Sequence, residues 1–203
     1  MAVGDVIGWV NSDDFYYPGT FHYIRHIFEQ NPEIDVISGD YSFVDADGRI
    51  RSVHREVGFD RNVFLFAGKC YLANSAMFFR ASLLKKHAGP REDLHYAMDY
   101  ELYLRLSAEA HFLHARRILG CYRLHDDSKT VSALLQMQEE TKRVQEEYLE
   151  RFRATGDWMS NPLACRLMKP IAMARRILLK ARGGCYFPKK PPAYALDFKR
   201  SAA

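Results

Sequence analysis

Two adjacent carboxylates, Asp13 and Asp14, follow a short apolar stretch near the start of the 203-residue chain. Residues 6–10 predict a buried strand, and the short polar side chains of residues 11–14 favour a turn after it. A turn lets the two carboxylates converge, whereas an extended chain would point them apart. At the carboxyl edge of an α/β sheet, such a pair suits a hard divalent cation that also binds phosphate oxygens. The alternative is an Asx-turn that merely ends the strand and caps the next helix.

Two later segments carry further groups that could do chemistry. A helical pattern starts at Asp99 and holds Arg105 near its end. A polar loop after a later apolar run begins beside Arg123 and holds His125. Taken alone, each has an ordinary explanation. Asp99 would be a helix cap, His125 a loop histidine, and the two arginines surface charges.

The apolar patterns predict the elements that must position these groups. Helices are expected at residues 19–30, 59–67, 81–87, 99–106 and 130–154. Strands are expected at residues 6–10, 34–44, 49–53, 72–79 and 112–124. Residues 45–48 carry a hairpin signal, and we interpret Asp40, Asp45 and Asp47 as turn residues.

The composition is typical of a globular chain, with 48% hydrophobic and 13% aromatic residues. No apolar run is long enough to span a bilayer, and the first residues lack the basic-then-apolar pattern of a signal peptide. The four cysteines are widely spaced, which predicts reduced thiols and not a disulfide frame or zinc site. We therefore expect a cytoplasmic protein.

The net charge of +4 is unevenly distributed. Residues 1–161 hold 19 Lys/Arg and 24 Asp/Glu, whereas residues 162–203 hold 10 Lys/Arg and one acid. Residues 162–182 predict a basic amphipathic helix kinked at Pro170, followed by a disordered end. This helix either packs on the body or attaches to an anionic membrane surface, as a peripheral contact on the inner face. Nucleic acid is not expected, because stacking aromatics are not interleaved with the basic residues.

The segments around the candidate groups resemble, in order and spacing, those of family 2 glycosyltransferases with the GT-A fold. The stretch GDVIGWVNSDDFYYPG resembles the metal-binding stretch of that family, with Asn11 where many members carry the first Asp. MDYELYLRL resembles the helix whose Asp is the catalytic base, which is Asp99 here, and Met98 replaces a more general Glu. YRLHDDSKT resembles the late segment whose His completes the metal coordination, which is His125 here. The resemblance covers residues 1–155.

The resemblance implies an α/β fold. A partial GT-A, Rossmann-like sheet with flanking helices would occupy residues 1–155, followed by a helical extension over residues 156–203. The implied activity is an inverting, metal-dependent transfer of a sugar from a nucleotide-sugar donor to a glycan or lipid-linked acceptor hydroxyl, in polysaccharide or glycolipid synthesis. The cofactor would be Mn²⁺ or Mg²⁺. The implied roles are metal binding by Asp13, Asp14 and His125, donor binding by the same two aspartates with Arg105 and Arg123, and proton abstraction by Asp99.

One departure concerns the order of the family's parts. Members carry a nucleotide-binding half before the metal motif, which starts at residue 11 in this chain. We therefore expect an acceptor-side half that is inactive alone and exposes a strand edge near residues 6–10, where it self-associates or pairs with a partner. The alternative is a non-catalytic relative that serves as an interaction module or needs a separate nucleotide-binding polypeptide. A smaller departure is residues 73–76, where relatives often carry Gln-Pro.

Overall fold

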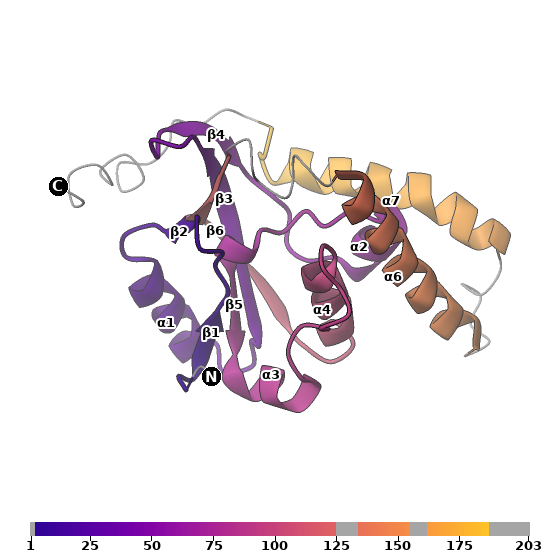
Figure 1. Cartoon of the computed structure of the whole chain (residues 1–203), viewed down its shortest axis with the longest axis horizontal. Coiled ribbons are helices and arrows are strands. Elements are labelled where there is room, and N and C mark those ends of the chain that lie inside the picture. Colours follow the sequence, from indigo (N-terminus) through magenta and orange to yellow (C-terminus); the bar gives the residue numbers. More distant parts are fainter. Residues whose placement is uncertain (1–2, 125–133, 155–161, 187–203) are drawn as a thin grey trace.

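The computed structural model describes residues 3–124, 134–154 and 162–186. Within them the chain forms an α/β fold around a mixed, curled sheet (Figure 1). The loop that holds His125, the start of the predicted helix at 130–154 and most of the predicted disordered end lie outside the described residues.

In the described part of the chain, six strands form one sheet in the order β1-β5-β3-β6-β2, with β4 paired to β3. β3 and β6 are parallel, and the other neighbours are antiparallel. Because β5 runs against both β1 and β3, the carboxyl ends of β1, β3 and β6 share one edge of the sheet. The strands are β1 (Val6–Gly8), β2 (Phe15–Tyr16), β3 (Val36–Val44), β4 (Ile50–His54), β5 (Met77–Arg80) and β6 (Phe112–Arg123).

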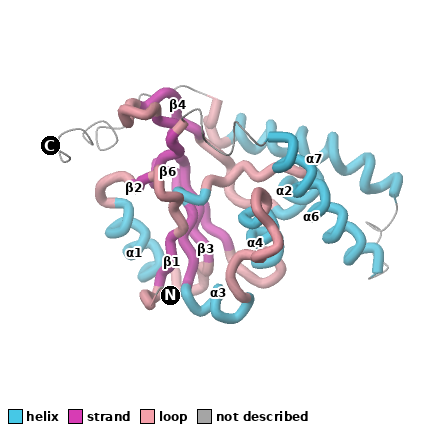
Figure 2. The backbone as a smooth tube through the Cα atoms, in the orientation of Figure 1, coloured by secondary structure: helices cyan, strands magenta, loops and turns pink. Residues whose placement is uncertain are grey.

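Helices cover both faces of the sheet (Figure 2). On one face lies α1 (Thr20–Gln30), whose buried Ile24 and Phe28 pack against Ile37 and Phe78. On the other face lies a larger core, where burial of each large apolar side chain contributes roughly 1.5–3 kcal/mol. Its helices are α2 (Arg61–Ala67), α3 (Ala81–His87), α4 (Met98–Leu106), α6 (Leu134–Ala154) and α7 (Pro162–Arg182).

Most predicted elements are found close to their expected bounds. The strand expected at residues 72–79 is wrong in its first half, where residues 74–76 form a 3₁₀ turn and β5 covers only Met77–Arg80. β1 differs from the prediction in burial. Val6 and Ile7 are only half-buried, and Gly8 is exposed. The reason is the position of β1 at the edge of the sheet, where it pairs with β5 alone. A short apolar run does not reveal whether its strand is central or at an edge.

The turn interpretation holds for Asp45 and is wrong for Asp40. In the β3–β4 hairpin, Asp45 Oδ1 accepts the N–H of Arg49 at 2.8 Å. Asp40 instead lies within β3, is buried, and has its Oδ1 at 3.2 Å from Nε2 of His114. That histidine comes from the parallel neighbour β6, so the partner that makes burial of Asp40 acceptable is distant in sequence.

α7 packs on the body, which was one of the two arrangements expected of the basic tail. Arg176 and Lys180 contact the buried carboxylate of Glu56 at 3.0 and 2.8 Å, and Ala172 is buried. The helix is continuous through Pro170. The membrane contact of this helix stays a prediction.

Two statements about membranes and thiols follow from the described residues. No helix among them combines the length and apolar character needed to cross a membrane. Cys70, Cys121 and Cys185 are free thiols, as the cysteine spacing predicted.

Candidate functional site

Residues 11–14 form a turn directly after β1, as predicted. The Asp14 N–H donates to the Asn11 carbonyl at 3.2 Å, and the Asn11 side-chain amide donates to Asp14 Oδ2 at 3.0 Å. β2 follows at once and pairs with the end of β6, which anchors the turn at the carboxyl edge of the sheet. Gly19 is the N-cap of α1 and no side chain caps that helix, so the capping alternative for the two aspartates is wrong.

Arg123 ties this turn to the end of β6. Its backbone N–H donates to Asp14 Oδ1 at 2.9 Å, and its Nε donates to the Asp13 carbonyl at 2.9 Å. Its Nη1 donates to the Asp45 carbonyl of the β3–β4 hairpin at 3.2 Å. Arg123 therefore joins the ends of β1, β3 and β6 and places a positive charge beside the two aspartates.

Asp14 is a half-buried carboxylate with a raised pKa. Burial is the main cause of the shift, the hydrogen bond from the Arg123 N–H opposes it, and the charge of Asp13 raises the pKa further. Each oxygen of Asp14 already accepts one hydrogen bond. A carboxylate has about four lone-pair sites, so each oxygen can still accept a second partner.

Asp13 and Asp14 fit a hard divalent cation by the type of their ligand atoms. They form only a pair: no group of three or more His, Cys, Asp or Glu suited to a metal ion occurs in the part of the chain that the structure describes. His125, the third ligand that the resemblance implies, lies outside that part. A pair of carboxylates still matches the usual mode of Mg²⁺ binding, in which substrate phosphates and water supply the remaining ligands.

Asp99 lies in the first turn of α4 with Cys70 against it. Its Oδ1 accepts the N–H of Tyr100 at 2.7 Å, and its Oδ2 accepts the thiol of Cys70 at 3.8 Å. Burial raises the pKa of Asp99 to about 6, although the hydrogen bonds oppose the shift. A carboxylate with this pKa is matched to proton transfer near neutral pH.

Asp99 does not occupy the N-cap position of α4. The N-cap residue is Ala97, and its side chain makes no capping bond. Glu140 of α6 accepts the N–H groups of Tyr96 and Ala97 at 2.5 and 2.7 Å and so satisfies this helix start from outside. Asp99 still satisfies one free N–H of the first turn, that of Tyr100, so its explanation as a residue that stabilises the helix start holds in part.

Tyr122, near the end of β6, has a pKa that is affected by the charges of both Asp14 and Asp99. Its phenol oxygen accepts a hydrogen bond from the Asn11 side chain. Burial is the first cause of the raised pKa of Tyr122, followed by the negative charges of Asp99 and Asp14. The charges of two carboxylates that are far apart in sequence thus both raise the pKa of one half-buried tyrosine.

Two further tyrosines lie around the same centre, and with Tyr122 we call them the tyrosine cluster. Burial and the charge of Asp14 raise the pKa of Tyr16 to about 12, and its buried hydroxyl has no hydrogen-bond partner among the described residues. Burial and then the charge of Asp99 raise the pKa of Tyr103. Each of these tyrosines lies in a different one of the three resembling segments, but sequence reasoning missed the cluster, because the segments are far apart in the chain and only the fold brings them together.

Gly120 in β6 allows the close packing of the turn that carries the hydrogen-bond partner of Tyr103. A Cβ at Gly120 would lie 2.0 Å from the carbonyl oxygen of Ser75, so the 3₁₀ turn η1 (Asn74–Ala76) can approach β6 only at a residue without a side chain. The same turn presents Asn74, whose Oδ1 accepts the Tyr103 hydroxyl at 2.6 Å.

We expect Tyr103→Phe to lower the free energy of unfolding by ~1–3 kcal/mol, because the buried Asn74 carbonyl would lose its donor. Urea unfolding followed by circular dichroism measures this change. The control is Tyr186→Phe, since Tyr186 is exposed and the same substitution there should change stability by less than ~0.5 kcal/mol. Equally small effects in both variants would show that this hydrogen bond does not hold the site together.

Arg105, predicted to bind the donor, is engaged in bonds within the body. Its Nε donates to Glu101 at 3.1 Å, its Nη2 donates to the Gly89 carbonyl at 2.8 Å, and its Nη1 donates to the His87 carbonyl. These bonds fix the loop after α3 onto α4 and give Arg105 a structural role. Donor binding by Arg105 stays a prediction.

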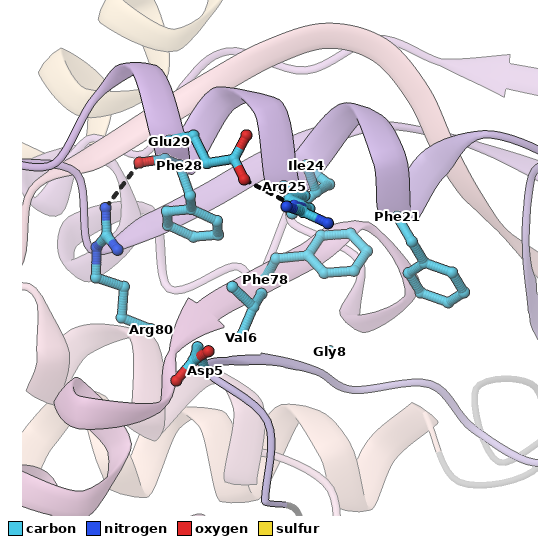
Figure 3. Close-up of a pocket in the computed structure, with 10 residues that line it drawn as sticks. All are labelled: Asp5, Val6, Gly8, Phe21, Ile24, Arg25, Phe28, Glu29, Phe78 and Arg80. Carbon is cyan, nitrogen blue, oxygen red and sulfur yellow. Dashed lines mark hydrogen bonds and ion pairs between the residues drawn. The ribbon is translucent and has the colours of Figure 1, made fainter.

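A groove of about 630 Å³ lies between β1 and α1 (Figure 3). Its polar residues include an ion pair between Arg25 and Glu29, and Arg80, which donates to the Phe28 carbonyl at 3.1 Å. None of the residues predicted to bind metal, donor or acceptor lines it. The apolar lining consists of Val6, Phe21, Ile24, Phe28 and Phe78.

Comparison with known proteins does not assign the chain to a family. A scan against models of protein families finds no match to the chain, and no curated protein matches it. The functional assignment therefore depends on the residues of the site and on the resemblance of their segments.

Proposed function

We propose that this chain is the acceptor-side part of an inverting, metal-dependent glycosyltransferase of the GT-A type. The observation that carries the proposal is the turn after β1, where the Asn11 side chain and the Arg123 N–H each bind one oxygen of the Asp14 carboxylate. This turn offers a pair of oxygen ligands at the carboxyl edge of the sheet, and burial of Asp99 in the first turn of α4 raises its pKa to about 6. The three resembling segments imply the same roles in the same order.

The turn after β1 suits the donor's diphosphate. Asp13 and Asp14 would hold a divalent cation, which neutralises the charge that develops on the departing nucleoside diphosphate. The bonds from Asn11 and from the Arg123 N–H orient the Asp14 carboxylate before any ligand binds. The guanidinium of Arg123 adds a fixed positive charge on the same side.

Asp99 takes the proton of the acceptor hydroxyl as the new glycosidic bond forms. With a pKa of about 6 it is mostly ionised at neutral pH, and it remains a stronger base than an exposed aspartate. The Tyr100 N–H holds one of its oxygens in place. Attack from the side opposite the departing diphosphate inverts the anomeric carbon of the sugar.

Glycosyl transfer is the direct test. The chain is incubated with Mn²⁺, a panel of uridine- and guanosine-diphosphate sugars and lipid or glycan acceptors, alone and together with a nucleotide-binding half. We expect release of nucleoside diphosphate only in the second case. No release with any donor in either case would contradict the proposal.

The groove beside β1 favours a second candidate, a non-catalytic interaction module. An edge strand presents unpaired N–H and C=O groups to a further strand, and Phe21 at the groove is 65% exposed. An added strand would pair with β1 and cover the apolar lining. In a glycosyltransferase the nucleotide-binding half would occupy this place, so both candidates use the same surface.

We expect the purified chain to self-associate as its concentration rises, because the β1 edge and the groove are exposed together. Size-exclusion chromatography with light scattering measures the mass. Phe21→Lys should shift it towards the monomer by placing a charge at the groove. Leu135→Lys, at an exposed position of α6, is the matched control and should leave the mass unchanged. A wild-type chain that stays monomeric at its highest soluble concentration would contradict the prediction.

A further inference from the structure

The inner face of α7 combines apolar and cationic contacts: Ala172 is buried, Met168 and Leu179 pack against the core, and charged side chains lie beside them. Arg176 lies 3.0 Å and Lys180 2.8 Å from the buried carboxylate of Glu56. Arg175 pairs with Asp60 at 2.6 Å. The body therefore holds this helix through ion pairs as well as apolar contacts, and other apolar residues of the helix remain exposed.

The outer face of α7 is apolar and uncovered. Leu167, Ile171 and Leu178 recur at helical spacing along one stripe, and Met173 and Ile177 extend it sideways. These five residues are 49–65% exposed. In Figure 1 the helix runs along the outside of the molecule, beyond α2. A continuous apolar surface of this kind marks a contact with another molecule or with a membrane.

The borders of this apolar face are cationic. By helical spacing Lys169 lies along one border and Arg175 and Arg182 along the other, while Arg166 lies between Met173 and Ile177. All four are exposed, although Arg175 also pairs with Asp60. Residues 162–182 contain no Asp or Glu. Long cationic side chains that flank an apolar stripe can extend their charged ends towards phosphates while the stripe enters an apolar layer.

We propose that α7 lies in the surface of an anionic lipid membrane, with its outer apolar face in the boundary between headgroups and acyl chains. The apolar face supplies the insertion, and the cations on both borders meet lipid phosphates. A second copy of the chain fits this face less well, because two such helices would bring cationic borders together without any acid on either helix. The membrane contact does not depend on glycosyl transfer.

The sequence alone suggested that cations would drive such a contact. In the structure Arg176 and Lys180 are turned to the body, so the apolar residues and the remaining border cations must provide the binding. This assignment predicts that loss of the apolar face abolishes binding, whereas salt, which screens only the cationic part, weakens it.

Sedimentation of the full chain with lipid vesicles tests the proposal. We expect binding to vesicles of phosphatidylcholine with phosphatidylglycerol to be ~10-fold or more tighter than to phosphatidylcholine alone, because several border cations contribute. Ile171→Asp/Ile177→Asp should abolish binding to both. The matched control is Val3→Asp/Leu135→Asp, which places the same two charges at exposed apolar positions outside α7 and should bind as the wild type does.

Thermal unfolding checks that both double variants fold, and light scattering reports the oligomeric state. The proposal is overturned if the wild type binds neither vesicle. It is also overturned if Ile171→Asp/Ile177→Asp binds as tightly as the control, or if this variant converts a dimer to a monomer while vesicles are not bound. The last result would assign the face to a second copy of the chain.

Discussion

Asp99→Asn in the complete glycosyltransferase should lower kcat by ~10²-fold or more, because the variant cannot accept the proton of the acceptor hydroxyl. Donor binding should stay nearly unchanged, since Asp99 does not belong to the turn at residues 11–14. Steady-state kinetics with a saturating donor and calorimetry of donor binding separate these two effects. Near-normal turnover would remove Asp99 from the mechanism.

The same residue should set the pH dependence of the reaction. Burial raises the pKa of Asp99 from an ordinary 3.8 to about 6. The base form is therefore lost as pH falls through about 6, and kcat/KM should fall with it, by roughly tenfold per pH unit below that value. Any residual activity of Asp99→Asn should lack this limb of the profile.

A stability measurement distinguishes a catalytic Asp99 from a structural one. A raised pKa means that the folded state binds the proton more tightly than the unfolded state. The favourable contribution is fully present below pH 3.8 and is lost as pH rises towards about 6. At pH 7 we expect Asp99→Asn to be more stable than the wild type by ~1–3 kcal/mol, with no difference near pH 3. A variant that is both inactive and less stable would show that Asp99 holds the fold together instead.

Asp14→Asn should weaken Mn²⁺- or Mg²⁺-dependent donor binding by more than ~100-fold, which exceeds the loss typical of an outer-shell partner. The amide keeps an oxygen for the Arg123 N–H, so this variant removes the charge without leaving that donor unpaired. Asp14→Ala should abolish metal-dependent binding and lose stability as well. Isothermal calorimetry with and without the metal measures the binding.

The control for this experiment is metal-independent binding of the donor, which should be the same in wild type and Asp14→Asn. His125→Ala should weaken metal-dependent binding less than either Asp14 variant, as expected of a ligand that completes the coordination. Unchanged metal-dependent binding in Asp14→Asn would contradict the assignment of this turn as the cation site.

Local signals in the sequence were sufficient to predict α1 and the turn that holds Asp14. Pro18 and Asn31-Pro32 bracket the pattern that became α1, and the polar run after the first strand became the turn that holds Asp14. These features depend on the backbone preferences of a few neighbouring residues, so they can be predicted without the rest of the chain.

Which strands and side chains lie next to one another depends on the strand order and pairing of the sheet. Its order placed β1 at an edge and so half-exposed a strand that reads as buried. The parallel pairing of β3 with β6 brought His114 to Asp40, and the approach of η1 to Gly120 brought Asn74 under Tyr103. The pairing register depends on both strands together, so the sequence of either strand alone does not predict it.

The sequence by itself determined that Asp13, Asp14 and Asp99 are carboxylates in a turn and at a helix start, and that residues 162–182 are helical and basic. Only the tertiary structure decided that the Arg123 N–H at the end of β6 binds Asp14, that burial moves the pKa of Asp99 towards neutrality, and that α7 points cations inward. The reason is that burial and electrostatic interaction depend on distances between groups far apart in the chain, which the fold alone sets.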